Sequence, residues 1–222
     1  MVLDTSIAGL PRYIAVEGPI GVGKTTLARK LAKSFNYEVL LESPRPNPFL
    51  KRFYKNRQQA ALPTQLFFLF ERARQIQELK QGDMFQPVRV ADFIIEKDRL
   101  FAEINLDADE LKLYENINAH LTIDAPIPDL VIYLQAPADV LLERIHQRGA
   151  EIEQNIDKTY ITQLVDAYTK LFHDYTASPL LIVNASDIDL AQNSQDYENL
   201  LQFLLSIKNG RHYYNSPRQA MI

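Results

Sequence analysis

The chain has 222 residues, which is enough for one α/β domain with a sizeable core. The hydrophobic share of 46% and the charged share of 23% are ordinary for a globular protein, and the net charge of −4 argues against nucleic-acid binding through a broad basic face. The absence of cysteine excludes disulfides and thiolate metal sites. Residues 1–11 lack a signal-peptide pattern and no run approaches the roughly 18 apolar residues of a membrane helix, so we expect a cytoplasmic protein without a membrane or nucleic-acid partner.

Apolar runs alternate with segments of helical spacing along the whole chain. They predict strands over 13–17, 37–41, 88–92, 130–134 and 180–183, and helices over 25–35, 49–56, 65–80, 96–104, 109–121, 137–148, 159–175 and 197–207. Thr64 is the expected N-cap of the long helix. The pattern predicts a parallel sheet with right-handed crossovers in a single domain over 1–222, with a lead-in at 1–11 and a polar tail at 211–222 that could be mobile.

One stretch after the first predicted strand fits the G-x-x-x-x-G-K-[ST] pattern of a phosphate-binding loop. It runs Gly18, Pro19, Ile20, Gly21, Val22, Gly23, Lys24, Thr25 and continues into the helix with Thr26. Its backbone N–H groups and the helix N-terminus would bind a polyphosphate, Lys24 would reach the β- and γ-phosphates, and the Thr25 hydroxyl would ligate Mg²⁺. A glycine-rich turn can match the pattern by chance, but the flanking strand and helix favour nucleotide binding.

Two carboxylates follow predicted strands, Glu42 after the second and Asp92 after the third. Ligands bind outside the carboxyl ends of parallel strands, so both side chains are expected beside the phosphate loop. One can help to hold Mg²⁺ and the other can accept a proton from an attacking hydroxyl. The alternatives are a solvated strand end for Glu42 and a helix N-cap for Asp92.

Arg144 and Arg148 are four residues apart on the helix over 137–148, so they share one face. Arginines suit phosphoryl transfer because charge spreads over the equatorial oxygens of the transferring group. This helix end and the polar loop after Gly149 could close as a lid. The alternative is a solvated basic face paired with Glu143.

Gln65, Phe68 and Arg72 share one face of the long helix. An amide, an aromatic ring and a guanidinium could together bind and stack a planar base. The alternative is that most apolar residues of this segment belong to the core.

These motifs, in this order, resemble the deoxynucleoside kinases of bacteria and animals, over about 13–175. The resemblance implies the P-loop kinase fold, an α/β fold with a five-stranded parallel sheet of order 2-3-1-4-5 and helices on both faces, and a homodimer. It further implies a general base at Glu42, ligands of the sugar 3′-hydroxyl at Tyr54 and Glu153, base contacts at Gln65, Arg72 and Asp98, stacking by Phe101 or Phe68, a metal ligand at Asp92, and lid arginines at Arg144 and Arg148.

The chain departs from the animal members at two points. Their Glu-Arg-Ser after the third strand is Asp92-Phe93-Ile94 here, and Arg89 and Arg99 are the two candidates to supply the lost cation. Their further lid arginine is replaced by Ala150. Both departures are similar to bacterial members.

The function expected from these features is ATP- and Mg²⁺-dependent phosphorylation of the 5′-hydroxyl of a deoxynucleoside, with deoxyadenosine favoured, followed by deoxyguanosine and deoxycytidine. A thymidylate-type monophosphate kinase is an alternative that shares the fold. A nucleotide-dependent switch without its own acceptor is the other alternative, although the chain has no Asn-Lys-x-Asp guanine motif.

Overall fold

A computed structural model describes residues 10–42, 46–82, 88–121, 125–190 and 193–216, with the side chains of 79–82 left out. The strands are β1 (Tyr13–Glu17), β2 (Glu38–Leu40), β3 (Arg89–Ala91), β4 (Leu130–Gln135), β5 (Leu180–Asn184) and β6 (Arg211–Tyr214). The helices are α1 (Lys24–Phe35), α2 (Leu50–Lys55), α3 (Arg57–Gly82), α4 (Lys97–Asn105), α5 (Ala108–Leu121), α6 (Ala138–Arg148), the 3₁₀ turn η1 (Glu151–Glu153), α7 (Lys158–Asp174) and α8 (Ser194–Leu205). Within the described ranges, no helix is both long and apolar enough to cross a membrane.

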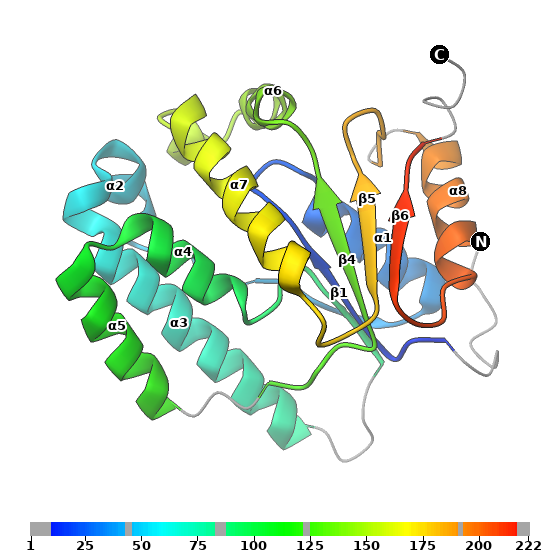
Figure 1. Ribbon diagram of the computed structural model, residues 1–222, viewed down its shortest axis with the longest axis horizontal. Coiled ribbons are helices and arrows are strands. Elements are labelled where there is room, and N and C mark those ends of the chain that lie inside the picture. The colour runs from blue at the N-terminus through cyan, green and yellow to red at the C-terminus, as the bar shows by residue number, and fades with distance from the viewer. Residues whose placement is uncertain (1–9, 43–45, 83–87, 122–124, 191–192, 217–222) are drawn as a thin grey trace.

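The strands form one parallel sheet of order β2-β3-β1-β4-β5-β6. The first five strands confirm the expected 2-3-1-4-5 order. Helix α7 crosses one face of this sheet and α1 lies on the other, while α2, α3, α4 and α5 gather at one side (Figure 1). All strands run the same way, so their carboxyl ends form one edge at which polar residues from distant segments meet.

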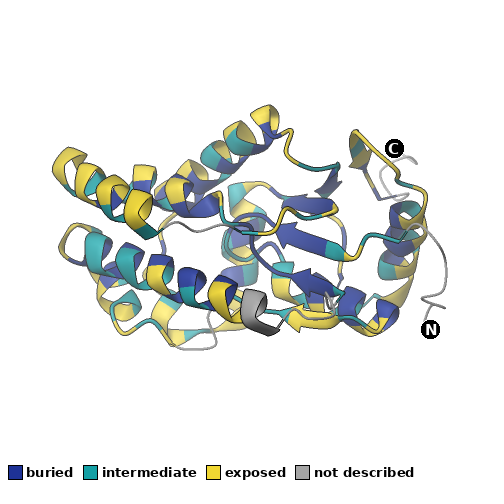
Figure 2. Cartoon of the chain, turned by 90° about the horizontal axis from the view of Figure 1, so that it is seen from below, coloured by how far each residue is buried: buried dark blue, intermediate teal, exposed yellow. Residues whose placement is uncertain are grey.

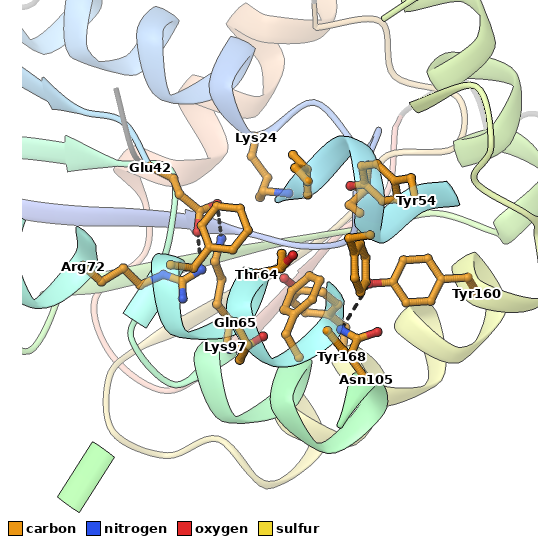
Figure 3. A pocket seen from close by; sticks show the side chains of 16 residues that line it. Lys24, Glu42, Tyr54, Thr64, Gln65, Arg72, Lys97, Asn105, Tyr160 and Tyr168 are labelled. Carbon is orange, nitrogen blue, oxygen red and sulfur yellow. Dashed lines mark hydrogen bonds and ion pairs between the residues drawn. The ribbon is translucent and has the colours of Figure 1, made fainter. Parts of the chain in front are cut away.

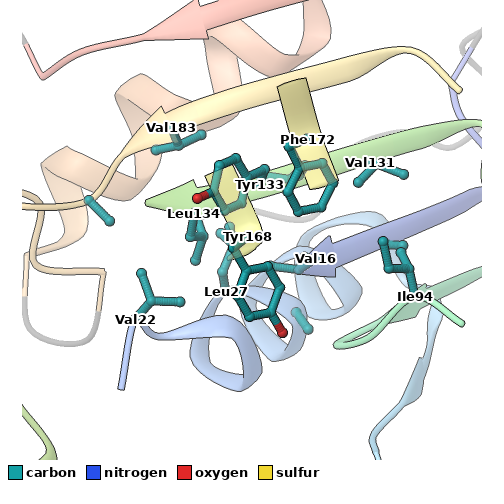
Figure 4. Packing of buried hydrophobic residues seen from close by; sticks show 14 of the residues in the cluster. Val16, Val22, Leu27, Ile94, Val131, Tyr133, Leu134, Tyr168, Phe172 and Val183 are labelled. Atoms are coloured by element: carbon teal, nitrogen blue, oxygen red, sulfur yellow. The ribbon is translucent and has the colours of Figure 1, made fainter. Parts of the chain in front are cut away.

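Aromatic packing between β4 and α7 fixes one layer of the core. The Tyr133 ring stacks on Phe172, with 4.2 Å between centroids, and on Tyr168, with 6.3 Å (Figure 4). Most strands are buried on both faces, and the helices bury one side each (Figure 2). This burial explains why the sheet strands are continuous apolar runs rather than alternating ones.

The expectation that the tail at 211–222 is mobile is wrong for its first part, which forms β6. Residues 211–214 pair in parallel with β5, so the sheet has six strands rather than five. Two residues of this polar segment hold the strand in place. Arg211 donates to the carbonyls of His173 and Tyr175 at the end of α7, and Tyr214 is buried against Phe203. Residues 217–222 and 1–9 lie outside the described residues.

The long helix begins earlier than predicted. Helix α3 starts at Arg57, so Thr64 lies inside it and is not its N-cap. Pro63 removes one helical hydrogen bond, but the first turns bury Ala60 and Ala61 in the core, and tertiary packing outweighs that loss. The other predicted elements are present, with ends that differ by only a few residues.

The two tyrosines of β6 offer a matched test of this strand. We expect Tyr214→Ala to lower the free energy of unfolding by about 3 kcal/mol, because the ring is buried and its loss leaves a cavity. Tyr213→Ala should change it by less than about 0.5 kcal/mol, because that side chain is 62% exposed. Urea unfolding measures both, and equal effects would show that β6 does not pack as described.

Candidate active site

The phosphate loop joins β1 to α1 at the carboxyl edge of the sheet. Gly18 has a φ of +148°, and a Cβ there would lie 2.3 Å from the carbonyl oxygen of Leu134, so only glycine fits. Gly23 is the N-cap of α1 with a φ of +104°. The Lys24 ammonium donates to the carbonyls of Gly18 (2.8 Å) and Pro19 (3.1 Å). Burial lowers its pKa.

A cavity opens on the outer side of this loop. It is lined by Gly21, Val22, Gly23, Lys24, Thr25, Thr26, Arg144, Gln147, Arg148, Ser186, Ile188, Asp189 and Leu190. The two arginines of α6 therefore lie beside the loop, as the lid interpretation requires. Arg144 donates to the carbonyls of Ala185 and Ser186, which fixes α6 to the segment after β5. Arg148 is half exposed and pairs with Glu153 at 2.6 Å.

Thr25 and Asp92 meet at the start of α1. The Thr25 hydroxyl donates to Asp92 Oδ2 at 2.6 Å, and Asp92 Oδ1 accepts the backbone N–H of Glu42 at 2.6 Å. A hydroxyl and a carboxylate are the hard oxygen ligands that Mg²⁺ prefers, with phosphate oxygens and waters completing the octahedron. These two residues fit a Mg²⁺ ion bound together with a nucleotide.

A second cavity lies on the inner side of the loop, between the loop and helices α2, α3, α4 and α7 (Figure 3). Lys24 lines both cavities, so they meet at this residue. The residues around it are Ile20, Lys24, Glu42, Leu50, Phe53, Tyr54, Ala61, Thr64, Gln65, Phe68, Arg72, Lys97, Phe101, Asn105, Tyr160 and Tyr168.

Most residues that the sequence predicts for the acceptor line this second cavity. Glu42, Tyr54, Gln65, Phe68, Arg72 and Phe101 do so directly. Asp98 lies behind them and accepts hydrogen bonds from Gln65 and Arg72 on one oxygen and from the Tyr114 hydroxyl on the other. Glu153 lines neither cavity and pairs with Arg148 instead.

Five charged side chains alternate in sign, in the order Glu17, Lys97, Glu42, Arg72, Asp98, and the middle three line this cavity. Lys97 Nζ lies 2.7 Å from Glu42 Oε2 and 3.7 Å from Glu17 Oε2. Arg72 bridges the other oxygen of Glu42 and Oδ1 of Asp98. We call this series the alternating charge chain.

Both cations act on Glu42, whose side chain is 25% exposed. Burial alone would raise its pKa, but the Lys97 ammonium and the Arg72 guanidinium outweigh burial and hold that pKa well below its usual range. The carboxylate is therefore ionised at neutral pH. Tyr54, close by, has its pKa raised by burial, so its hydroxyl stays protonated and can donate a hydrogen bond.

Neither arginine proposed to compensate for Phe93 reaches the site. Arg89 is at the first position of β3, paired in register with Tyr13 and Glu38 at the amino end of the sheet, away from the phosphate loop. Arg99 has a side chain that is 68% exposed and pairs with Glu103 and Glu115. Instead, Lys97, the first residue of α4, lies beside Glu42, on the carboxylate oxygen that Arg72 does not contact.

Sequence reasoning missed Lys97, Glu17, Tyr168, Asn105 and Tyr160. Glu17 offered one signal, because a carboxylate in a buried apolar strand must have partners. It accepts the backbone N–H groups of Gly18 and Ile94 and the Tyr168 hydroxyl. The others come from α4 and α7, and no local pattern places those helices against the loop.

Comparison with known proteins agrees with this geometry. The family model described as deoxynucleoside kinase matches residues 14–207. A deoxyguanosine kinase of Bacillus subtilis is 36% identical over 197 residues, which covers 85% of this chain and 93% of the relative. A deoxyadenosine kinase of Lactobacillus acidophilus is 30% identical over 205 residues, covering 86% of this chain and 94% of the relative.

Solved structures agree as well. The structure of a deoxyadenosine kinase from M. mycoides with the products dCMP and dCDP bound superposes with a TM-score of 0.75 at 25% identity, covering 88% of this chain and 100% of that one. The expected resemblance to the deoxynucleoside kinases is therefore confirmed by both sequence and fold. The chain belongs to the deoxynucleoside kinase family of enzymes.

Proposed function

We propose that this protein transfers the γ-phosphoryl group of ATP to the 5′-hydroxyl of a purine deoxynucleoside, in nucleotide salvage. The observation that carries the proposal is that two cavities meet at Lys24, with the phosphate loop on one side and Glu42 on the other. The relatives that support a purine are kinases of deoxyguanosine and deoxyadenosine. Gln65 and Arg72 line the acceptor cavity and offer an amide and a guanidinium that a purine edge can pair with, and Asp98 orients both.

The proposed roles follow from position. Glu42 accepts the proton of the 5′-hydroxyl while the oxygen of that hydroxyl forms the new bond to the γ-phosphorus. The bond from that phosphorus to the bridging oxygen breaks, and its electron pair leaves with ADP. Lys24 and Arg148 neutralise phosphate charge, and Arg144 holds the lid helix to the segment after β5. Thr25 and Asp92 would hold Mg²⁺, which supplies charge neutralisation on the phosphates.

The remaining predicted residues bind the acceptor in this proposal. Tyr54 donates to the sugar 3′-hydroxyl, and Phe68 and Phe101 pack against the base, since all three line the acceptor cavity. Glu153 would have to exchange its partner Arg148 for the sugar as the lid closes.

Two alternative functions are less well supported. A monophosphate kinase is less well supported because the relatives reported above are kinases of deoxynucleosides. A non-catalytic switch would leave the acceptor cavity without a role.

A steady-state assay with ATP and Mg²⁺ tests the proposal. We expect turnover of deoxyguanosine or deoxyadenosine, and a kcat about 100-fold or more lower in Glu42→Gln, because the amide cannot accept the proton. The KM for ATP should change little. Glu38→Gln, an exposed glutamate of β2, is the matched control and should behave like the wild type. Turnover of monophosphates alone, or of none of the four deoxynucleosides, would overturn the proposal.

The proposed metal site has its own test. Asp92→Asn removes a negative charge but keeps an oxygen for the N–H of Glu42. We expect the Mg²⁺ concentration for half-maximal activity to rise about tenfold or more. Asp166→Asn, at an exposed position of α7, should leave it unchanged. An unaltered Mg²⁺ dependence in Asp92→Asn would remove that residue from the metal site.

We also propose a homodimer formed through α3 and α5, which pack side by side (Figure 1). Phe70 of α3 and Leu113 of α5 are large apolar side chains that are 50% and 48% exposed, and an interface between two copies of the chain would bury them.

Light scattering after gel filtration measures the mass. We expect a dimer for the wild type and a monomer for Phe70→Glu with Leu113→Glu, because charge cannot be buried in an apolar interface. Leu205→Glu on α8, where the side chain is 37% exposed, is the control and should stay dimeric. A wild-type monomer would exclude the interface.

A further inference from the structure

Lys97 has surroundings that a structural ion pair alone does not require. Its side chain is only 3% exposed, yet it lines the acceptor cavity together with Lys24 and Glu42. Burying an ammonium is costly, and apolar residues of similar volume often replace a buried ion pair without loss of stability. A buried lysine at the edge of a substrate cavity therefore needs a reason beyond folding.

The position of Lys97 follows from three segments. Helix α4 begins at Lys97, so the residue projects from the first turn next to the carboxyl ends of β1 and β3. Glu17 at the end of β1 lies on one side of the ammonium and Glu42 after β2 on the other. The ring of Phe93, which follows Asp92, is 5.9 Å from Nζ. The site after β3 thus receives a positive charge from Lys97, four positions after Phe93 in the chain.

The ammonium also has bonding capacity left. It has three N–H donors, and among the described residues one hydrogen bond is made, to Glu42. The contact to Glu17 is an ion pair of 3.7 Å, longer than a hydrogen bond. An ammonium with spare donors, beside the carboxylate that faces the acceptor hydroxyl, can bind an oxygen that becomes negatively charged.

We propose that Lys97 is a catalytic residue of this enzyme, the cation on the acceptor side of phosphoryl transfer. This inference rests on the function proposed above. As the 5′-oxygen bonds to the γ-phosphorus and its proton passes to Glu42, the spare N–H donors of Lys97 bind the equatorial oxygens of the transferring group, opposite Lys24. Glu17, which is fully buried and held by Gly18 and Tyr168, fixes the ammonium in place.

The first test compares chemistry with binding. In Lys97→Met we expect kcat to fall about 100-fold, as for other preorganised donors to a transition state. The dissociation constant of the deoxynucleoside, measured by calorimetry, should change by less than about threefold, because the base and sugar contacts are untouched. Lys112→Met, at an exposed position of α5, is the control for the loss of a lysine.

The second test restores the charge chemically. The chain has no cysteine, so Lys97→Cys introduces the only thiol. Alkylation with 2-bromoethylamine in denaturant, followed by refolding, gives a side chain that ends in an amine, like lysine. Alkylation with iodoacetamide gives a neutral side chain. Wild-type protein carried through the same steps is the reference, and circular dichroism with ATP binding checks refolding.

We expect the aminoethyl form to recover kcat to within about tenfold of the refolded wild type, and the neutral form to stay as low as Lys97→Met. The pair carries the test if Lys97→Met does not fold. An unchanged kcat in Lys97→Met, an equal loss of kcat and of nucleoside affinity, or equal activity of the two alkylated forms would overturn the proposal. Absence of turnover in the wild type would instead overturn the proposed function.

Discussion

The site depends on one electrostatic constraint, which is that buried charges must be paired. The alternating charge chain satisfies it with five side chains from β1, α3, α4 and the end of β2. Removing one partner would leave an uncompensated buried charge, at a cost of about 3–5 kcal/mol. The five residues therefore hold four segments of the fold at fixed distances.

This constraint also sets the chemistry. Glu42 is in the middle of the chain, with a cation on each carboxylate oxygen, so it is ionised and its direction is fixed. A carboxylate with such a low pKa is a weak base toward an ordinary hydroxyl group. In the proposed mechanism, Glu42 takes the proton of the acceptor hydroxyl only when that hydroxyl begins to bond to phosphorus, since its proton then becomes far more acidic.

The donor side is organised by the parallel sheet rather than by charge pairs. The glycine at position 18 lets the loop pass close to the backbone of β4, and the loop then turns into α1 at Gly23. Arg144 donates hydrogen bonds to the carbonyls of Ala185 and Ser186, which link α6 to the segment after β5. Lys24, at the meeting point of the two cavities, couples the two halves of the site.

The departure after the third strand shows that a positive charge can reach the site from a different position in the sequence. Phe93 provides no charge, and the two arginines that sequence spacing offered lie elsewhere. Lys97 brings a cation to the carboxylate from the next helix, because the first turn of α4 faces the sheet edge. A linear motif search looks at fixed spacings and cannot detect such a replacement.

The sequence by itself determined the order of strands and helices, the phosphate loop, and the residues Glu42, Gln65, Arg72 and Asp92 as a candidate constellation. These rest on local periodicity, on glycine geometry and on the rule that ligands bind at the carboxyl ends of parallel strands. Only the tertiary structure decided that Lys97 and Glu17 join that constellation, that Arg89 and Arg99 do not, and that residues 211–214 form a sixth strand. The reason is physical. Burial and ion pairing depend on which distant segments meet. The sequence alone therefore does not show that Lys97 is buried beside Glu42 or that Arg211 binds the end of α7.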